Sequence, residues 1–384
     1  MEKLVDIILL SYENPELLKK CVRSVLEHTK VSSRLIIVDN ASREPEVELY
    51  LQGLHGNDNV AIEKIFSEEN AGFAAGMNKG MRLSGAPFLC LLNNDCVVTK
   101  GWLEEMITVA ESRDDIGLVN PQSNTFGSLP DGRASVDEHA ALLGDKKGKF
   151  VELGHAIGFA CLVKREVVER IGYLDEAYRG VCYEDTDFSV RAQKAGFIAV
   201  MAEGAYVSHV EQASRRNLKG VEQVYQRNRE IFEGKWGRLL RVFYLENFRG
   251  NTEEILSRYE TLKGLARERA IIEMWIDGKN SFGESFSQDE DKRPTRHADI
   301  NVNDFPKRFT GPAVIWRVLT KKKKYDAVIM EDGFLLRFLR FLKPLHRVDV
   351  FSIGGDMRAR SAEGREFDLK EPFVLAEYLR KKVV

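Results

Sequence analysis

The sequence predicts an α/β protein with a mostly parallel sheet. Short apolar runs occur at residues 4–10, 34–38 and 88–92, and each ends in polar residues. Uninterrupted apolar runs, rather than alternating ones, are typical of strands that are buried on both faces. An amphipathic stretch separates the first two runs. Strand, helix and strand in this order form a βαβ unit, which implies parallel strands.

The amphipathic stretch is expected to form a helix that begins at Pro15, with Asn14 as its N-cap. Proline is favoured at the first helical position and asparagine at the cap. Apolar residues then recur at spacings of three and four, which predicts one buried face; they are Leu17, Leu18, Cys21, Val22, Val25 and Leu26. A further strand is expected at residues 60–65.

The third apolar run ends in the polar triplet Asn93-Asn94-Asp95. In open α/β sheets, ligands bind beyond the carboxyl ends of the strands, so this triplet falls where a site is expected. The carboxylate of Asp95 can hold a hard divalent cation, and such a cation can neutralise a diphosphate. The alternative is a strand-ending turn, because all three residues favour turns.

Composition limits the class of protein. The 384 residues fit two or three domains. With 43% hydrophobic and 30% charged residues, the chain has the composition of a soluble globular protein. A net charge of −2 gives no general attraction to nucleic acid. The five cysteines contain no CxxC pair, so neither a zinc site nor a disulfide framework is indicated, and a reducing cytoplasm is the simplest compartment. Because no apolar run is long enough for a membrane span, any membrane contact would be peripheral.

Several motifs follow one another in a fixed order: ILLSYEN, IIVDNAS, NAGFAAGMNKG, LLNNDC, YEDTDFSVRAQKAGF and VSHVEQAS. In this order and spacing they resemble a family 2 glycosyltransferase with the GT-A fold, over about residues 4–240. The resemblance implies an inverting, metal-dependent transfer of a sugar from a nucleoside diphosphate sugar. UDP is the first choice of nucleotide and dTDP the second. The acceptor would be a hydroxyl of a glycan, a lipid-linked glycan or a protein, as in polysaccharide biosynthesis.

The resemblance also assigns the donor site to strand ends and to the glycine-rich stretch. Tyr12 can pack on the base, and Asp39 can accept the imide N–H of uracil or thymine. The full set of donor residues is Ser11, Tyr12, Asp39, Asn40, Asn70, Gly72, Asn78 and Asn94. Glycine lets the backbone approach a ligand closely. Glycines at four-residue spacing are also typical of helix packing points, so both interpretations stay open.

By the same resemblance, Asp95 matches the last acid of the metal-binding DxD motif, and Asn93 stands where the first acid is usual. Weaker metal binding or a second ligand from elsewhere is therefore expected, and the resemblance indicates His209. The metal would be Mn²⁺ or Mg²⁺, and neutral imidazole suits Mn²⁺ better. A lone histidine after an apolar strand is also often structural.

The acids of YEDTD are expected in the first turn of a helix, where the helix dipole favours their ionised form. An ionised carboxylate is what deprotonation of a sugar hydroxyl requires. The resemblance makes Asp185 the general base and places Gly158, Glu184 and Asp187 at the acceptor, where Glu184 and Asp187 would shape the pocket or orient their neighbours. Capping of a helix by acids is the structural alternative.

Outside the resemblance, the sequence indicates three parts. Residues 1–240 would form the GT-A domain, 241–298 a helical extension and linker, and 299–384 a small α/β unit of unknown role. Residues 253–277 are expected to form a polar amphipathic helix. The basic run 321–324 fits a solvated surface or an anionic membrane surface. Placement at the inner face of the membrane and homo-oligomerisation stay open.

Two other functions were compared with the transferase. A sugar nucleotidyltransferase would require an early glycine-rich loop with Arg and Lys for a nucleoside triphosphate, and SYENPELLKK contains no such loop. A catalytically silent nucleotide-binding or scaffold protein would be expected to lack both Asp95 and Asp185. Both are present, although the Asn93 departure keeps this alternative open.

Overall fold

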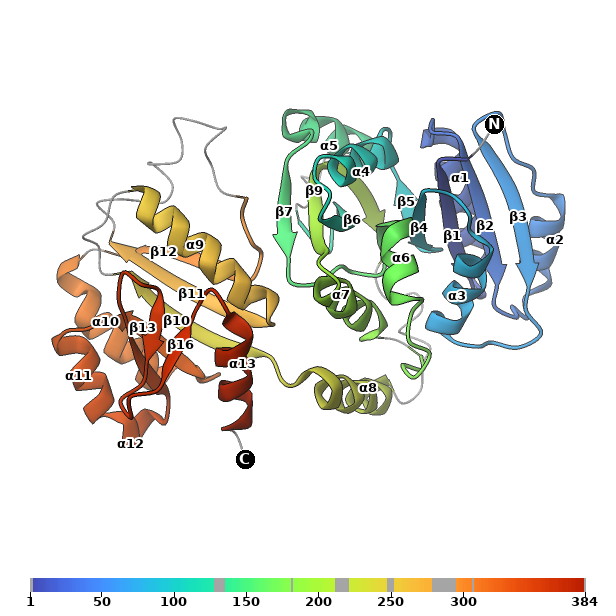
Figure 1. The fold of residues 1–384 in the computed structure, drawn as a ribbon. Helices are drawn as coiled ribbons and strands as arrows, with labels where there is room; N and C mark the ends of the chain where they lie inside the picture. Colours follow the sequence, from blue (N-terminus) through green and yellow to red (C-terminus); the bar gives the residue numbers. More distant parts are fainter. Residues whose placement is uncertain are drawn as a thin grey trace. The chain divides into compact units, whose positions relative to one another are not determined.

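The computed structural model describes residues 3–127, 135–180, 182–210, 221–246, 252–277, 295–305 and 307–382. The chain divides into two compact units (Figure 1). Unit 1 comprises residues 1–236 and unit 2 comprises residues 237–384.

Unit 1 is built on a nine-stranded sheet. Four adjacent strands are parallel, in the order β3-β2-β1-β4. Beyond β4 the order continues β8-β6-β9-β5, with β7 also paired to β9 and with both directions of pairing present. The strands are β1 (Val5–Ser11), β2 (Ser33–Asp39), β3 (Val60–Phe66), β4 (Phe88–Asn93), β5 (Cys96–Val98), β6 (Ile116–Gln122), β7 (Phe150–Leu153), β8 (Ala160–Lys164) and β9 (Ile198–His209). The predicted α/β class with a mostly parallel sheet is confirmed.

Helices cover both faces of this sheet. One core contains buried residues of α1, α2 and α4, and the opposite core contains residues of α3, α6 and α7. The helices are α1 (Pro15–His28), α2 (Pro45–Gly53), α3 (Phe73–Leu83), α4 (Trp102–Glu111), α5 (Val136–Leu142), α6 (Arg165–Ile171), α7 (Glu184–Lys194) and α8 (Val221–Trp236), with a 3₁₀ turn at Leu143–Lys146. As predicted, α1 begins at Pro15, but the side chain of Asn14 makes no capping hydrogen bond.

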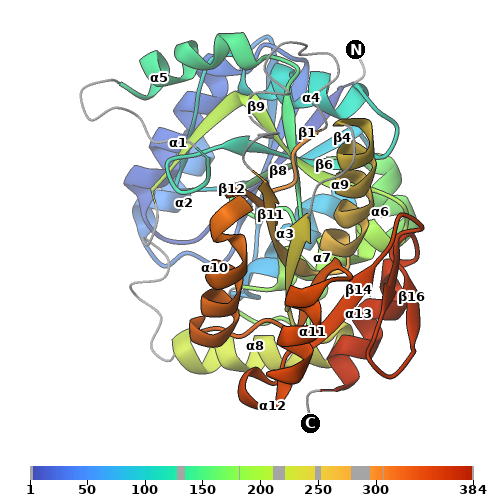
Figure 2. The same cartoon turned by 90° about the vertical axis from the view of Figure 1, so that its left-hand side faces the viewer.

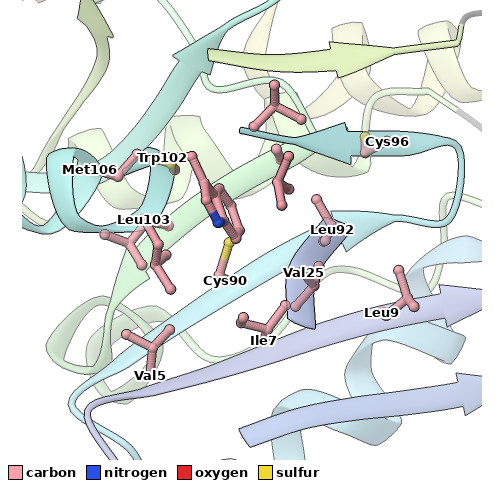
Figure 3. Close-up of a cluster of buried hydrophobic side chains, with 14 of the residues drawn as sticks. Val5, Ile7, Leu9, Val25, Cys90, Leu92, Cys96, Trp102, Leu103 and Met106 are labelled. Carbon is pink, nitrogen blue, oxygen red and sulfur yellow. The ribbon is translucent and has the colours of Figure 1, made fainter. Parts of the chain in front are cut away.

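The two-sided burial explains the uninterrupted apolar runs. Val5, Ile7 and Leu9 of β1 point into the core that also contains Val25 of α1 and Trp102 of α4 (Figure 3). Ile8, between them, belongs to the opposite core. Since successive strand residues face opposite sides, both sides of the strand must be apolar. Each large side chain buried in this way stabilises the fold by roughly 1.5–3 kcal/mol.

Unit 2 is built on a seven-stranded sheet of its own, in the order β12-β11-β10-β13-β14-β15-β16. The first five strands are parallel and the last two are antiparallel. Counted along the chain, the parallel strands have the order 3-2-1-4-5, which is a doubly wound arrangement. The strands are β10 (Leu240–Glu246), β11 (Ala270–Asp277), β12 (Ile300–Phe305), β13 (Ala327–Glu331), β14 (Asp349–Ile353), β15 (Arg358–Arg360) and β16 (Glu366–Asp368).

The helices of unit 2 also lie on both faces of their sheet. Residues of α9 and α13 share one core, and residues of α10 and α11 share the other. These helices are α9 (Thr252–Arg267), α10 (Lys307–Thr320), α11 (Phe334–Phe341), α12 (Lys343–His346) and α13 (Pro372–Lys381). No helix in the described part of the chain combines the length and apolar character needed to cross a bilayer.

The structure corrects the prediction that residues 241–298 and 299–384 form two separate parts. Residues 241–298 are not a separate helical extension and linker, because β10 and β11 pair in the same sheet as β13 and β14. The predicted helix at 253–277 ends at Arg267, and Ala270–Asp277 is a strand. Glu273 of this strand forms ion pairs with Arg317 and Lys321. Residues 278–294 of the predicted linker lie outside the described residues.

Candidate active site

The polar residues that follow β1, β2 and β4 meet at one edge of the unit 1 sheet. In the parallel register Ser11 lies beside Asp39, and Leu10 lies beside Asn93. The three carboxyl ends are therefore adjacent, which is where the order of the apolar runs predicts a ligand.

A cavity of about 530 Å³ opens at this edge. Tyr12 and Phe66, which are 42% and 49% exposed, contribute its two aromatic side chains. The remaining lining is mostly polar and acidic, and includes Asp39, Arg43, Glu48, Glu68, Glu69 and Asn70. Sequence reasoning missed Phe66. Its position could have indicated a role at the site, because Phe66 ends the strand next to β2 and is paired with Asp39 in the register.

The carboxylate of Asp39 is held in place at the cavity. Ser42 donates to it from its hydroxyl, at 2.6 Å, and from its backbone N–H, at 3.3 Å. The Asp39 side chain keeps acceptor capacity, because an ionised carboxylate has about four lone-pair positions. The hydroxyl of Ser11, on the neighbouring strand, is buried and has no hydrogen-bond partner within the described structure. Ser42 was not predicted.

Asn40 holds the loop that leads to α3. Its amide donates to Asn70 Oδ1 at 2.9 Å and to the Gly72 carbonyl at 3.2 Å, and its oxygen accepts from the Ala71 N–H at 3.1 Å. The predicted direct donor contact from Asn40 is corrected to a role in positioning the loop, because these bonds occupy its amide. Gly72 precedes α3 with a φ of 82°, a conformation that favours glycine. A Cβ at Gly72 would lie 3.5 Å from the backbone nitrogen of Gly180.

The structure also corrects the role predicted for Asn78. Its amide nitrogen donates to the Leu174 carbonyl and to Glu176, and its oxygen accepts from the Leu174 N–H. The side chain is 1% exposed, so it braces α3 and is not available to a donor. Gly76 and Gly80 are packing points: a Cβ at either position would lie 2.5 Å from a side-chain atom of β1.

Asp95 and His209 come together where β5 pairs with β9. Cys96 lies opposite His209 in this antiparallel pair, and His209 Nε2 is 3.3 Å from Asp95 Oδ1. The imidazole is stacked on Phe159, with 5.2 Å between ring centroids. Asn124 brackets the histidine backbone, since its Oδ1 accepts from the His209 N–H at 2.7 Å. A carboxylate oxygen and an imidazole nitrogen therefore face each other with the ring held in a fixed plane.

The neighbouring donor atoms fit a divalent cation. The Oδ1 atom of Asn93 is buried without a partner in the residues that the structure describes, and Asn94 is 8% exposed. Cys96 Sγ lies within 4.8 Å of the Asp95 and His209 ligand atoms. Burial raises the Cys96 pKa well above its usual value, and the thiol donates to the Phe159 carbonyl, so it is a poor ligand. The usable pair is one carboxylate and one imidazole, and the amide oxygen of Asn93, two residues before Asp95, would be a further ligand if it turned toward them; phosphate oxygens or water would fill the remaining coordination positions.

Asp185 lies in the first turn of α7 beside the loop before β8. Its Oδ2 accepts from the Gly158 N–H at 3.0 Å, and its Oδ1 accepts from the Thr186 N–H at 2.7 Å. A Cβ at Gly158 would lie 3.5 Å from Asp185 Oδ2 and 3.7 Å from the ring of Phe73. The structure thus brings Asp185, Gly158 and the start of α3 together.

Asp187 is buried among its hydrogen-bond partners. It is 1% exposed and accepts from Trp236 Nε1 at 2.9 Å, Tyr178 Oη at 3.2 Å and Arg191 Nε at 2.8 Å. These contacts tie α7 to α8, which is a structural role. Glu184 is also buried, at 7% exposure.

Asn228 of α8 supports the loop before α7, and sequence reasoning missed it. Its amide donates to the carbonyls of Arg179, at 3.1 Å, and Cys182, at 3.2 Å. Cys182 and Tyr183, directly before α7, have φ values of 76° and 78°. No local signal marks Asn228, because its partners are 46 to 49 residues away. Residues 211–220, which hold part of the last predicted motif, lie outside the described residues.

Several known proteins resemble this chain in sequence. A family model described as glycosyl transferase family 2 matches residues 6–172. Glycosyltransferase AglE of Haloferax volcanii is 24% identical over 208 residues, covering 53% of this chain and 66% of that protein. The low-salt glycan biosynthesis hexosyltransferase Agl10 of the same organism is 24% identical over 235 residues, covering 58% and 72%. An uncharacterised protein, y4gI of Sinorhizobium fredii, is 29% identical over 248 residues, covering 59% of this chain and 27% of y4gI.

Among solved structures, mannosyltransferase PcManGT of Pyrobaculum calidifontis, in complex with GDP-Man and Mn²⁺, aligns with a TM-score of 0.43 at 15% identity. This alignment covers 56% of the present chain and 59% of that one. TarS residues 1–349 of S. aureus, in complex with UDP-GlcNAc, align with a TM-score of 0.45 at 12% identity, covering 62% and 66%. The chain thus spans between about a quarter and three quarters of the length of these relatives. The match to glycosyl transferase family 2 covers residues 6–172, which lie within unit 1.

Proposed function

We propose that unit 1 transfers a sugar, with inversion, from UDP-sugar or dTDP-sugar to a hydroxyl of a glycan, lipid-linked or protein acceptor. The observation that carries this proposal is the meeting of Asp95 and His209 at the sheet edge where β1, β2 and β4 end. Asp185 supplies a second carboxylate in the same unit, held by Gly158.

The cavity lined by Tyr12, Asp39 and Phe66 suits the base of the donor. An aromatic face can stack on a pyrimidine, and the Asp39 carboxylate can accept the imide N–H that uracil and thymine share. Glu48, Glu68 and Glu69 line the same cavity, whereas Arg43 is its one basic lining residue. Because these acids would repel phosphate, the cavity suits base and ribose, and the diphosphate belongs nearer Asp95.

Asp95 and His209, together with the unpartnered Asn93 oxygen, would hold Mn²⁺ or Mg²⁺. Such a cation, when bound, neutralises the charge that develops on the leaving diphosphate. The protein contributes the fixed orientation of the ligands: Phe159 stacks on the imidazole and Asn124 holds the histidine backbone. A bound cation would thus be added to a preformed arrangement.

Asp185 acts as the general base. It lies in the first turn of α7, and the Gly158 N–H orients its Oδ2. The carboxylate takes the proton of the acceptor hydroxyl as the oxygen forms a bond to the anomeric carbon. The bond from that carbon to the diphosphate oxygen breaks on the opposite face, so the configuration inverts and the nucleoside diphosphate leaves with the electron pair.

The test is calorimetric binding of a panel of nucleoside diphosphate sugars, with and without Mn²⁺. We expect one uridine or thymidine sugar to bind with a marked dependence on the metal. Asp95→Ala should lose this dependence, whereas Asp58→Ala, which removes an exposed acid outside the site, should bind like wild type. If no sugar nucleotide binds to the well-folded protein, the silent-scaffold alternative replaces the transferase.

A further inference from the structure

We infer that unit 2 docks on an anionic lipid bilayer through the outer surface of α10, α11 and α12. We define this α10–α12 face by four exposed side chains: Trp316, Phe334, Phe341 and Leu345. The inference rests on unit 2 alone and does not depend on the activity proposed for unit 1.

The three helices form one layer on one face of the unit 2 sheet. Val314 and Val318 of α10 and Leu336 and Leu339 of α11 are buried in the same core. Figures 1 and 2 show α10, α11 and α12 next to one another in both views. The exposed side chains lie on the opposite side of these helices from the buried ones, so they point away from the sheet.

The exposed surface of α11 is an aromatic stripe. Phe334, Phe338 and Phe341 are spaced by four and three residues, which places them on one side of the helix. The rings of Phe334 and Phe338 are stacked, with centroids 6.0 Å apart. Phe334 is 85% exposed and Phe341 is 78% exposed. Large apolar side chains grouped in this way mark an interaction surface.

Trp316 of α10 and Leu345 of α12 extend the stripe, and each is 70% exposed. Tryptophan is enriched where proteins meet the headgroup region of a bilayer, because its ring has both apolar and polar parts. On the opposite face of the same sheet, the large apolar residues of α13 are less exposed. Phe373 is 50% exposed and Val374 is 49% exposed.

The α10–α12 face is also basic. Residues 311–347 contain nine Lys and Arg but three Asp and Glu. Some of these cations are engaged, since Arg317 and Lys321 pair with Glu273. Lys322, Lys323 and Arg347 are exposed, and they form no ion pair with any residue that the structure describes.

This combination favours a lipid surface over a protein partner. Basic amphipathic helices lie in the plane of the interface, with aromatic and leucine side chains in the acyl boundary and cations at the headgroups. Protein interfaces are instead depleted in lysine. A segment that carries both exposed lysines and exposed phenylalanines therefore complements an anionic bilayer in both charge and hydrophobicity.

The experiment is flotation of the full-length chain with vesicles of phosphatidylcholine containing 30% phosphatidylglycerol, compared with vesicles of phosphatidylcholine alone. The probe variants are Phe334→Ser with Phe341→Ser, and Lys322→Gln with Lys323→Gln. The matched controls are Phe373→Ser with Val374→Ser, and Lys370→Gln with Lys381→Gln, which change exposed residues of the same kinds elsewhere in unit 2. Thermal unfolding of each variant monitors its folding.

We expect binding to the anionic vesicles that weakens as salt is added. The phenylalanine variant should bind at least 10-fold more weakly, and the lysine variant about 25-fold more weakly, at roughly 5-fold per lysine. Both controls should bind like wild type. Absence of binding to either vesicle overturns the proposal. An equal loss of vesicle binding in the probe variants and the control variants also overturns it. Salt-resistant self-association that the phenylalanine variant abolishes would assign the face to a second copy of the chain instead.

Discussion

Asp185 is the residue on which the proposed chemistry depends most directly. Asp185→Asn keeps the shape of the side chain and a hydrogen-bond acceptor for Gly158, but removes the base. We predict that kcat falls roughly 10²- to 10⁴-fold, which corresponds to about 3 to 5.5 kcal/mol of barrier. The measurement is turnover of the donor that the binding panel identifies. Donor affinity should be unchanged, and an equal loss of affinity would assign Asp185 to donor binding.

Gly80 is a residue whose lack of a side chain lets α3 pack on the sheet. A Cβ there would lie 2.5 Å from a side-chain carbon of Ile8. Gly80→Ala should therefore lower the free energy of unfolding by roughly 1–3 kcal/mol, despite the better helix propensity of alanine. Chemical denaturation checks this prediction. Gly53→Ala, in α2, is the control, because a Cβ there meets nothing within 4 Å. If both substitutions changed the free energy of unfolding equally, the contact between the added Cβ and Ile8 would not be the cause.

Residues at strand ends could be predicted from the sequence, because the apolar runs locate them. Tyr12, Asp39 and Asp95 each follow such a run, and the parallel register brings the three strand ends together. Asn78 and Asp187 could not be assigned in this way. Asn78 bonds to Leu174, which is 96 residues away, and Asp187 bonds to Trp236, which is 49 residues away. The local sequence does not distinguish a polar side chain that stabilises the fold from one that contacts a ligand.

At the scale of elements, α8 holds the loop that orients α7. Asn228→Ala removes the hydrogen bonds to Arg179 and Cys182. We predict a 10- to 100-fold lower kcat with unchanged donor affinity, because small displacements of a catalytic group have large effects on rate. Donor turnover and calorimetry measure the two quantities. Gln226→Ala, an exposed position on the same helix, should behave like wild type. A loss of donor affinity without a loss of kcat would contradict this positioning role.

Helices and strands with a clear pattern of apolar residues were easier to predict than a strand that contains a buried charged side chain. The strands near 4–10, 34–38, 60–65 and 88–92 are present, and α1 begins at Pro15. The prediction of one helix over residues 253–277 was wrong for β11: Ile271 and Ile272 fit the apolar face of that helix, but in the structure they belong to a strand that also contains Glu273. In the structure, distant cations neutralise this glutamate, and those partners cannot be recognised from the local sequence.

At the scale of the whole molecule, the stability of unit 2 should depend on acid through Glu273. Burial raises the pKa of this carboxyl, but hydrogen bonds from Arg317, Lys321 and Tyr325 outweigh burial and lower it to about 2. Since the ionised form is favoured in the folded state, the stabilisation is complete above about pH 4.5 and is lost as the pH falls toward 2. The size is at most roughly 3 kcal/mol.

Denaturation of the wild type and of Glu273→Gln between pH 7 and pH 3 measures this contribution. The variant should be less stable at pH 7 and should lose less stability below pH 4.5. The metal-dependent donor binding of unit 1 should be the same in both proteins at pH 7. Parallel stability curves would show that Glu273 is not the titrating group.

None of the five cysteines forms a disulfide, and four of them are buried; Cys182, three residues before Asp185, is partly exposed. A thiol-reactive dye should therefore label the native protein at this one position, without removal of the other cysteines. Its fluorescence would report on the backbone beside the proposed base. The chain thus carries a natural attachment point for following, in real time, how substrates change that part of unit 1.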